Sequence, residues 1–188
     1  MVTGVASPRL FAWEIGTHEN ISREAISASA MGRILRDNLG LTGGVGTFLT
    51  DGWERNRIDT WIERGSIRED DWFLLSARFL NHFHHPLRPW NQAGLTDLAS
   101  GGSSAIWAQT PNQSTLTGSW SWQETRERYF FALSKPTKVQ RDRYLARTFR
   151  GLGHQIHLIQ DAASVPHTRN EQHAVGVSIE PWTDAFRV

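Results

Sequence analysis

One segment decides the fold: Thr137-Lys-Val-Gln-Arg-Asp-Arg-Tyr-Leu-Ala-Arg-Thr-Phe-Arg-Gly-Leu-Gly-His-Gln-Ile-His-Leu-Ile-Gln-Asp161. Its large apolar side chains recur at alternating intervals of four and three residues, which is the spacing of one face of an α-helix. The members of this stripe are Leu145, Phe149, Leu152, Ile156 and Ile159. The pattern predicts a long amphipathic helix over residues 137–161 that packs the stripe into a hydrophobic core.

Two shorter segments carry the same helical signal. Residues 22–39 place apolar side chains at helical spacing and are followed by Gly40, a residue typical of helix ends. Residues 121–133 form the second segment and come shortly before the long one. Both segments are therefore predicted to be helices that pack beside residues 137–161.

The region between these helices is predicted to be helical as well. Thr50 or Asp51 can cap a helix that runs through Ile62 and breaks at Gly65. Another helix is expected over residues 67–83, and no strand pattern of comparable length occurs in the sequence. The sequence therefore predicts an all-α, single-domain helical bundle.

Composition limits the range of functions. At 188 residues, of which 39% are hydrophobic, the chain has the size of one folded domain. Its formal net charge of +1 gives little support to a strong electrostatic grip on nucleic acid, so no stable nucleic-acid complex is expected. No stretch of the sequence approaches the roughly 20 apolar residues that span a bilayer. Because the sequence contains no cysteine, any zinc ligands must be His, Asp or Glu.

His157 and Asp161 form the first candidate site. They lie four residues apart in the predicted long helix, so both project from one face and can share a metal ion. Pro166 bends the chain just beyond the helix and can bring His167 back as a third ligand. A His and an Asp at this spacing are also compatible with a surface or capping pair, so the spacing alone leaves both interpretations open.

Four separated segments resemble one enzyme superfamily, the zinc-dependent phospholipases C and single-strand-specific nucleases. The central motif of that superfamily is similar to Gly151-Leu-Gly-His-Gln-Ile-His157, followed by Asp161 and by Val165-Pro-His-Thr-Arg-Asn170. Its His-Phe-x-x-Pro segment is similar to Asn81-His-Phe-His-His-Pro86, its acidic turn to Gly65-Ser-Ile-Arg-Glu-Asp70, and its opening element to Trp13-Glu-Ile-Gly-Thr-His18. The chain looks most like bacterial zinc-dependent phospholipase C-like proteins.

The resemblance implies a cluster of two or three zinc ions. The ligands that it places on this chain are Trp13, His18, Asp70, His82, His157, Asp161, His167, His173 and Glu180. In this set Asp161 bridges two ions, and Asp70 both binds zinc and acts as the catalytic carboxylate that orients or deprotonates water. His154 lies three residues before His157 on the same helix face, so it could be a further ligand, but a hydrogen-bonding role beside the ligands is the preferred interpretation.

Two positions depart from the pattern of the superfamily. Its secreted members bind zinc through a free amino-terminal Trp, whereas twelve residues precede Trp13 here. The last two ligands of the superfamily are four residues apart, but His173 and Glu180 are seven apart. Asp184, four residues after Glu180, is therefore an alternative ligand.

The resemblance to this superfamily also sets the expected domain limits. Residues 1–12 are expected to be a leader or a disordered segment, and residues 13–188 one phospholipase C-like helical domain. Residues 180–188 look like the beginning of a helix without its end. We therefore expect the domain to be incomplete at its C-terminus.

The function that the resemblance implies is zinc-dependent phosphodiester hydrolysis of the phospholipase C type. Zinc-activated water would cleave the head-group ester of a phospholipid, with transient contact to a membrane surface, in a secreted or extracytoplasmic protein. One alternative is a single-strand-specific nuclease, because the interval of five residues from Trp13 to His18 is closer to that branch. The other is a zinc-stabilised helical domain without catalysis.

Overall fold

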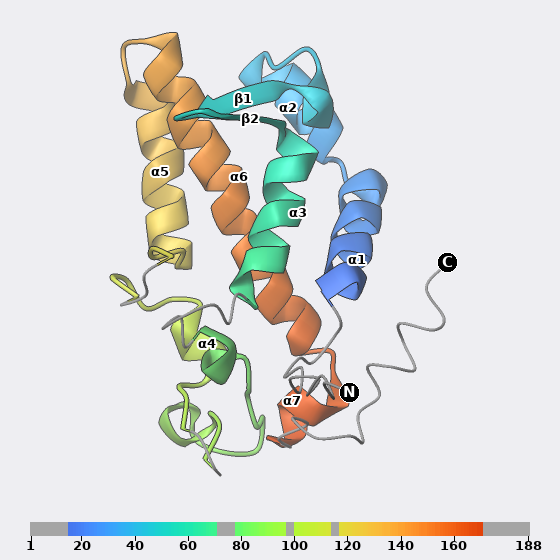
Figure 1. The fold of residues 1–188 in the computed structure, drawn as a ribbon, viewed down its shortest axis with the longest axis vertical. Helices are drawn as coiled ribbons and strands as arrows, with labels where there is room; N and C mark the ends of the chain where they lie inside the picture. Colours follow the sequence, from blue (N-terminus) through green and yellow to red (C-terminus); the bar gives the residue numbers. More distant parts are fainter. Residues whose placement is uncertain (1–14, 71–77, 97–99, 114–116, 171–188) are drawn as a thin grey trace, which may run out of the picture.

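The computed structural model describes residues 15–70, 78–96, 100–113 and 117–170, which form a mainly helical structure (Figure 1). The α-helices of this part are α1 (Ile15–Ala28), α2 (Met31–Leu39), α3 (Ile58–Glu69), α4 (Ser104–Trp107), α5 (Trp122–Ser134), α6 (Lys138–Asp161) and α7 (Val165–Arg169). Two strands, β1 (Phe48–Asp51) and β2 (Glu54–Arg57), and three short 3-10 helices, η1 (Gly44–Gly46), η2 (Arg78–Asn81) and η3 (Trp90–Gln92), complete it. The mainly-α expectation is confirmed.

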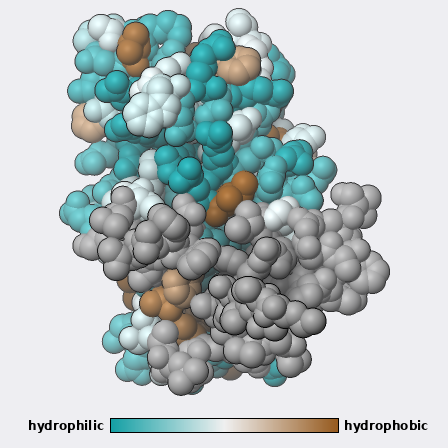
Figure 2. All heavy atoms as spheres, in the orientation of Figure 1, coloured by the Kyte–Doolittle hydropathy of each residue, from teal (hydrophilic) through white to brown (hydrophobic). Residues whose placement is uncertain are grey.

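The long helix α6 organises the molecule. It runs alongside α3 and α5, and α1 lies on the other side of α3 (Figure 1). The β1–β2 hairpin crosses the N-terminal half of α6. The hydrophobic core lies where these elements meet and consists of Ile26, Leu35, Leu49, Ile58, Trp61, Ile62, Ala132, Leu145, Ala146 and Phe149. None of the helices described is long and apolar enough to span a membrane. The visible outer face is mainly hydrophilic where it is coloured (Figure 2).

The start of α6 agrees with the sequence prediction. Thr137 is the N-cap and accepts a hydrogen bond from the backbone of Gln140, whose side chain reaches back to the Thr137 amide, which is a capping box. The helix then extends to Asp161. Ser121 caps α5 in a similar way by accepting from the backbone of Glu124. Local sequence signals therefore set the N-terminal ends of both helices.

The last turns of α6 depart from the predicted apolar stripe. Leu145 and Phe149 are buried as predicted, but Ile159, the last member of the apolar stripe, is 70% exposed. His157 and Asp161 are instead completely buried. Charged side chains are rarely buried without paired charges or a metal, so the C-terminal end of this helix is a candidate functional site.

Two glycines allow α3 and α6 to pack at very short distance. A Cβ on Gly65 would lie 2.0 Å from the carbonyl oxygen of Arg150, and one on Gly153 would lie 2.0 Å from that of Ile62. The prediction that Gly65 breaks a helix is therefore wrong, because α3 continues through it to Glu69. Gly65 is a contact point between helices, and the close approach places the end of α3 beside the candidate ligands of α6.

The helix predicted over residues 22–39 is two helices. α1 already begins at Ile15 and ends at Ala28, and α2 follows from Met31. Between them the Ser29 hydroxyl donates to the Ile26 carbonyl at 2.8 Å and accepts from the Met31 amide at 3.2 Å. A serine side chain that bonds to nearby backbone groups competes with helical hydrogen bonds, so the chain turns here.

The helix predicted from Thr50 or Asp51 through Ile62 begins later than expected, because residues 48–57 form an antiparallel hairpin and α3 starts only at Ile58. Asp51 pairs with Glu54 across a turn in which Gly52 has a φ of 64°. Gly52 is the first of the two turn residues, and a glycine there supplies the positive φ that such a turn needs. Asp51 accepts hydrogen bonds from Arg147 of α6 at 2.7 and 3.1 Å, so it attaches the hairpin to the long helix.

The helix expected over residues 67–83 is not observed in the described part of that range. α3 ends at Glu69, and Arg78–Asn81 is a 3-10 helix. Residues 71–77 lie outside the described residues, as do residues 1–12 and 180–188.

Candidate metal centre

Six of the nine expected zinc ligands lie within the described residues, and the structure brings all six together. They come from α1, the end of α3, the segment after η2, the last turns of α6, and α7. All of their side chains are buried. The six residues are His18, Asp70, His82, His157, Asp161 and His167. The other expected ligands, Trp13, His173 and Glu180, and the alternative Asp184, lie outside the described residues.

Asp161 is at the centre of this cluster. Its Oδ2 lies 3.1 Å from His157 Nε2, 3.0 Å from His82 Nδ1 and 3.5 Å from His167 Nδ1. Its Oδ1 lies 3.5 Å from His18 Nε2. The two carboxylate oxygens therefore face different imidazole rings, which is an arrangement suited to bridging two metal ions.

Asp70 approaches the same group of rings from the end of α3. Its Oδ1 lies 3.3 Å from His82 Nδ1 and 3.5 Å from His157 Nε2. Two overlapping triplets result, and the ligand atoms within each lie within 4.8 Å of one another. His18, His157 and Asp161 form one triplet, and Asp70, His82 and His157 form the other. Each triplet could hold a metal ion.

Hydrogen bonds at Nδ1 determine how two of the rings face the carboxylates. His157 Nδ1 lies 2.6 Å from the carbonyl oxygen of Ser66, and His18 Nδ1 lies 2.6 Å from Oε1 of Gln160. Both partners are acceptors, so each Nδ1 donates, and in the neutral ring Nε2 keeps its lone pair. An imidazole that binds a metal through Nε2 requires this tautomer.

A chain of buried polar side chains supports these two rings. Gln160 Nε2 donates to the Ser22 hydroxyl at 3.0 Å, and this hydroxyl donates to the Ser66 hydroxyl at 3.0 Å. The chain links α1, α3 and α6 behind His18 and His157. The orientation of both rings is therefore built into the packing of three helices.

The donor atoms of the cluster fit a metal site. Among the described residues, His18 Nε2, Asp70 Oδ2 and both carboxylate oxygens of Asp161 are buried without a hydrogen-bond partner. Each such atom costs about 1–3 kcal/mol of stability unless it is compensated. Nitrogen and oxygen donors without a competing thiolate form a set that binds zinc well. The same groups also form ion pairs with one another, and their geometry shows that a metal ion could be held there.

The carboxylates and imidazoles shift one another's pKa. Burial lowers the pKa of His18 to about 4, and the charge of His157 adds to this effect. Burial opposes protonation of His157 as well, but Asp70 and Asp161 outweigh it and raise the pKa of His157 to about 10. Although burial acts against it, the charges of His167 and His157 hold the pKa of Asp161 well below its usual range. The carboxylates therefore stay ionised and attract a proton or a metal ion.

A second buried cluster, which sequence reasoning missed, lies directly behind the ligands. Glu69 accepts from Arg78 Nε and Nη2 at 2.9 and 2.7 Å and from Trp107 Nε1 at 2.9 Å. Its Oε2 also faces His154 Nδ1, and its Oε1 lies 3.8 Å from His82 Nε2. Although burial raises it, the charge of Arg78 holds the pKa of Glu69 well below its usual range. Two signs of this cluster were present in the sequence: the acidic run that begins at Glu69, and His154, which was expected to be a hydrogen-bonding neighbour of the ligands.

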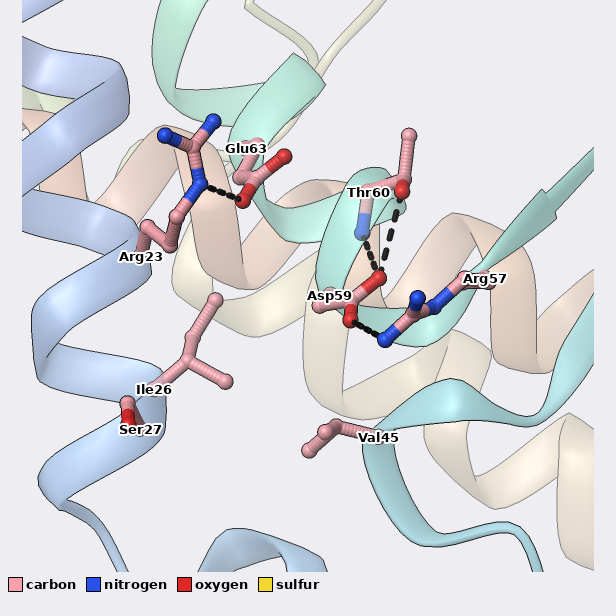
Figure 3. Close-up of a pocket in the computed structure, with 8 residues that line it drawn as sticks. All are labelled: Arg23, Ile26, Ser27, Val45, Arg57, Asp59, Thr60 and Glu63. Atoms are coloured by element: carbon pink, nitrogen blue, oxygen red, sulfur yellow. Dashed lines mark hydrogen bonds and ion pairs between the residues drawn. The ribbon is translucent and has the colours of Figure 1, made fainter.

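A pocket of about 450 Å³ lies elsewhere, between α1, η1, β2 and α3, and most of the residues that line it are polar (Figure 3). Its basic side chains are paired with acidic ones: Arg23 Nε donates to Glu63 at 3.1 Å, and Arg57 Nη2 donates to Asp59 at 2.5 Å. None of the six described ligands lines this pocket. The candidate metal centre is therefore a separate site.

The chain was compared with protein-family models, curated proteins and solved structures. No protein-family model matches the chain, and no curated protein or solved structure is significantly similar to it.

Proposed function

We propose that the protein is a zinc-dependent phosphodiester hydrolase of the phospholipase C type, which cleaves the head-group ester of a phospholipid. The observation that carries this proposal is the convergence of two buried His and Asp triplets that share His157, with Asp161 in contact with rings of both. The resemblance of the surrounding motifs to zinc-dependent phospholipases C supports the same conclusion. Two or three zinc ions are the proposed cofactor, and a secreted or extracytoplasmic location is proposed from the same resemblance.

The chemistry explains why these ligands suit this reaction. A phosphodiester is anionic and resists attack by water, and bound zinc would neutralise its charge and lower the pKa of a coordinated water to about 7. Asp161 and the imidazoles would hold the cation. Asp70 Oδ2, which has no hydrogen-bond partner in the described part of the chain, is the proposed acceptor of a proton from the attacking water.

A single-strand-specific nuclease is the first alternative. The interval of five residues between Trp13 and His18 favours it. The formal net charge of +1 favours the phospholipase instead, because nuclease affinity for a polyanion depends strongly on positive charge.

A zinc-stabilised domain without catalysis is the second alternative. It is favoured by the ion pairs within the cluster, such as the 3.1 Å contact between His157 and Asp161, because a paired site can stabilise a fold without turning over a substrate.

One set of assays separates these three functions. Zinc-loaded protein is offered a soluble phosphorylcholine ester and single-stranded DNA under the same conditions. We expect the protein to hydrolyse the ester and Asp70→Asn to abolish this activity. Asp37→Asn is the control and should retain it, because Asp37 is an exposed residue of α2 and its replacement removes the same charge away from the site. Cleavage of DNA alone would favour the nuclease, and zinc binding without hydrolysis of either substrate would favour the non-catalytic domain.

A further inference from the structure

A short exposed turn, Pro86-Leu-Arg-Pro-Trp-Asn-Gln92, lies beside the metal centre. We refer to it as the 86–92 turn. All seven of its residues are exposed. Leu87 is 89% exposed and Trp90 is 56% exposed, so two large apolar side chains project from one turn into solvent.

The turn is held in shape by its own backbone. The amide of Arg88 donates to the His85 carbonyl at 3.1 Å, and the amide of Gln92 donates to the Pro89 carbonyl at 2.8 Å. The two prolines further restrict the chain, because each fixes its own φ. Leu87 and Trp90 are therefore presented on an ordered backbone, which lowers the entropy lost when they bind a surface.

The base of the turn is joined to the ligand segments. The amide of His84 donates to the carbonyl of His167 at 3.0 Å, and the rings of Phe83 and His167 stack with centroids 4.4 Å apart. Asn170 donates to the carbonyls of Ala93 and Gly94 at 3.2 and 2.8 Å. A surface that binds the turn is therefore brought next to the candidate metal centre, at the end of the molecule that carries α7 (Figure 1).

The charge of this region favours a surface that carries phosphate groups. The 86–92 turn contains one Arg and no Asp or Glu, and the first acidic residue after it is Asp97. Within the turn, the positively charged Arg88 lies between Leu87 and Trp90 in sequence. Apolar and aromatic side chains beside a cationic one are typical of segments at the boundary between lipid head groups and hydrocarbon.

We propose that the 86–92 turn is a membrane-contact element, which inserts Leu87 and Trp90 into the boundary layer of a phospholipid surface and directs Arg88 to the phosphate groups. The inference rests on the proposed function in one respect, since the ester to be hydrolysed lies in that surface. Single-stranded nucleic acid is a less suitable partner. Trp90 can stack on a base, but Leu87, which is the more exposed residue, cannot.

Vesicle binding tests this proposal without depending on catalysis. The full chain, the double variant Leu87→Ser/Trp90→Ser and the control Trp53→Ser are each mixed with phosphatidylcholine vesicles, and the bound fraction is measured by flotation. Trp53 is a matched control because it is 94% exposed and lies in the β1–β2 turn, at the far end of the molecule (Figure 1). We expect the double variant to bind about tenfold more weakly and Trp53→Ser to bind like the unaltered chain.

Two further measurements, of oligonucleotide binding and of hydrolysis of a soluble ester, keep the outcomes distinct. The single variant Leu87→Ser separates partners, because it should weaken vesicle binding and leave any binding of a single-stranded oligonucleotide unchanged. An unaltered chain that does not bind vesicles, or a double variant that binds them equally well, overturns the proposal. Weaker oligonucleotide binding by the double variant with unchanged vesicle binding overturns it in favour of nucleic acid. If the vesicle results are as expected but the zinc-loaded protein does not hydrolyse a soluble phosphorylcholine ester, the proposed function fails and the membrane contact stands.

Discussion

Gly153 in α6 faces the carbonyl oxygen of Ile62 in α3 so closely that a Cβ on this glycine would lie 2.0 Å from the oxygen. The contact fixes the distance between the two helices at the level of the core. Asp70 follows α3 and His157 follows Gly153 by one helical turn, so the same contact sets the spacing of two candidate ligands. The fold and the metal centre therefore depend on one close approach.

Replacement of Gly153 by Ala should separate α3 from α6 and destabilise the protein. We expect the free energy of unfolding to fall by about 2 kcal/mol or more, because the new methyl group meets backbone and not a movable side chain. Gly32→Ala is the control: this helical glycine has its nearest neighbour, Arg36 Nη1, at 3.6 Å, so alanine there should raise stability by about 0.5–1 kcal/mol. Urea unfolding followed by circular dichroism measures both. Equal effects of the two substitutions would show that the close helix contact is unimportant.

The buried carboxylate of Glu69 should contribute far more to stability than the partly buried carboxylate of Glu63, whose partner Arg23 is exposed. Glu69→Gln leaves the buried guanidinium of Arg78 without its paired charge, which we expect to cost about 3 kcal/mol or more. Glu63→Gln removes the partner of the half-exposed Arg23 and should cost less than about 1 kcal/mol. Chemical denaturation measures the free energy of unfolding of both variants. A Glu69→Gln variant that is no less stable than Glu63→Gln would contradict the prediction.

Asp161 and His154 should differ in their effect on zinc binding, although both are buried residues of α6. Asp161→Asn is expected to weaken zinc binding by more than about 100-fold. Loss of a residue that only hydrogen-bonds to a metal ligand typically lowers metal affinity by about 10–100-fold, and loss of a ligand itself should cost more. His154→Gln should reduce stability through the lost hydrogen bond to Glu69 and change zinc affinity by less than about tenfold. Competition with a chromophoric chelator measures both affinities. Equal losses would mean that Asp161 is not a ligand.

The metal-free protein should be most stable near pH 6.5. Burial lowers the pKa of His18 to about 4 and that of His154 to about 3, so below the ordinary value of about 6.5 the unfolded chain binds protons more readily. Stability should therefore fall between pH 6.5 and 4. Despite burial, the charges of Asp70 and Asp161 raise the pKa of His157 to about 10. Its contribution is complete below pH 6.5 and is lost as the pH rises towards 10.

Urea unfolding in the presence of a chelator, repeated across this pH range, measures the dependence. His154→Gln is a useful control, because it removes one of the two histidines and should reduce the slope on the acid side. A flat profile between pH 4 and 6.5 would contradict the assigned burial of both histidines.

Sequence reasoning predicted α5 and α6 well because their signals are local. The N-caps Ser121 and Thr137 act within one turn of the chain, and the apolar period continues through Leu145 and Phe149. The β1–β2 hairpin was missed because each strand has only four residues, too few to show a clear alternation.

The candidate site was only partly accessible to the same reasoning. The interval from His157 to Asp161 predicts a shared face of one helix, but nothing in the spacing brings His18 or Asp70 to it, and their place in the cluster was implied by a resemblance alone. Arg78 could not be predicted as a buried residue, since arginine is usually exposed and its burial depends on the tertiary position of Glu69.

Zinc stoichiometry is the most direct test of the central claim, that the buried His and Asp triplets form a metal centre. The chain is freed of metal with a chelator, reloaded with zinc, separated from excess ion and analysed for bound metal and melting temperature. At least two zinc ions per chain, one for each triplet, together with a raised melting temperature, are the expected result. A chain that retains no zinc and melts at the same temperature with and without the ion would contradict the account.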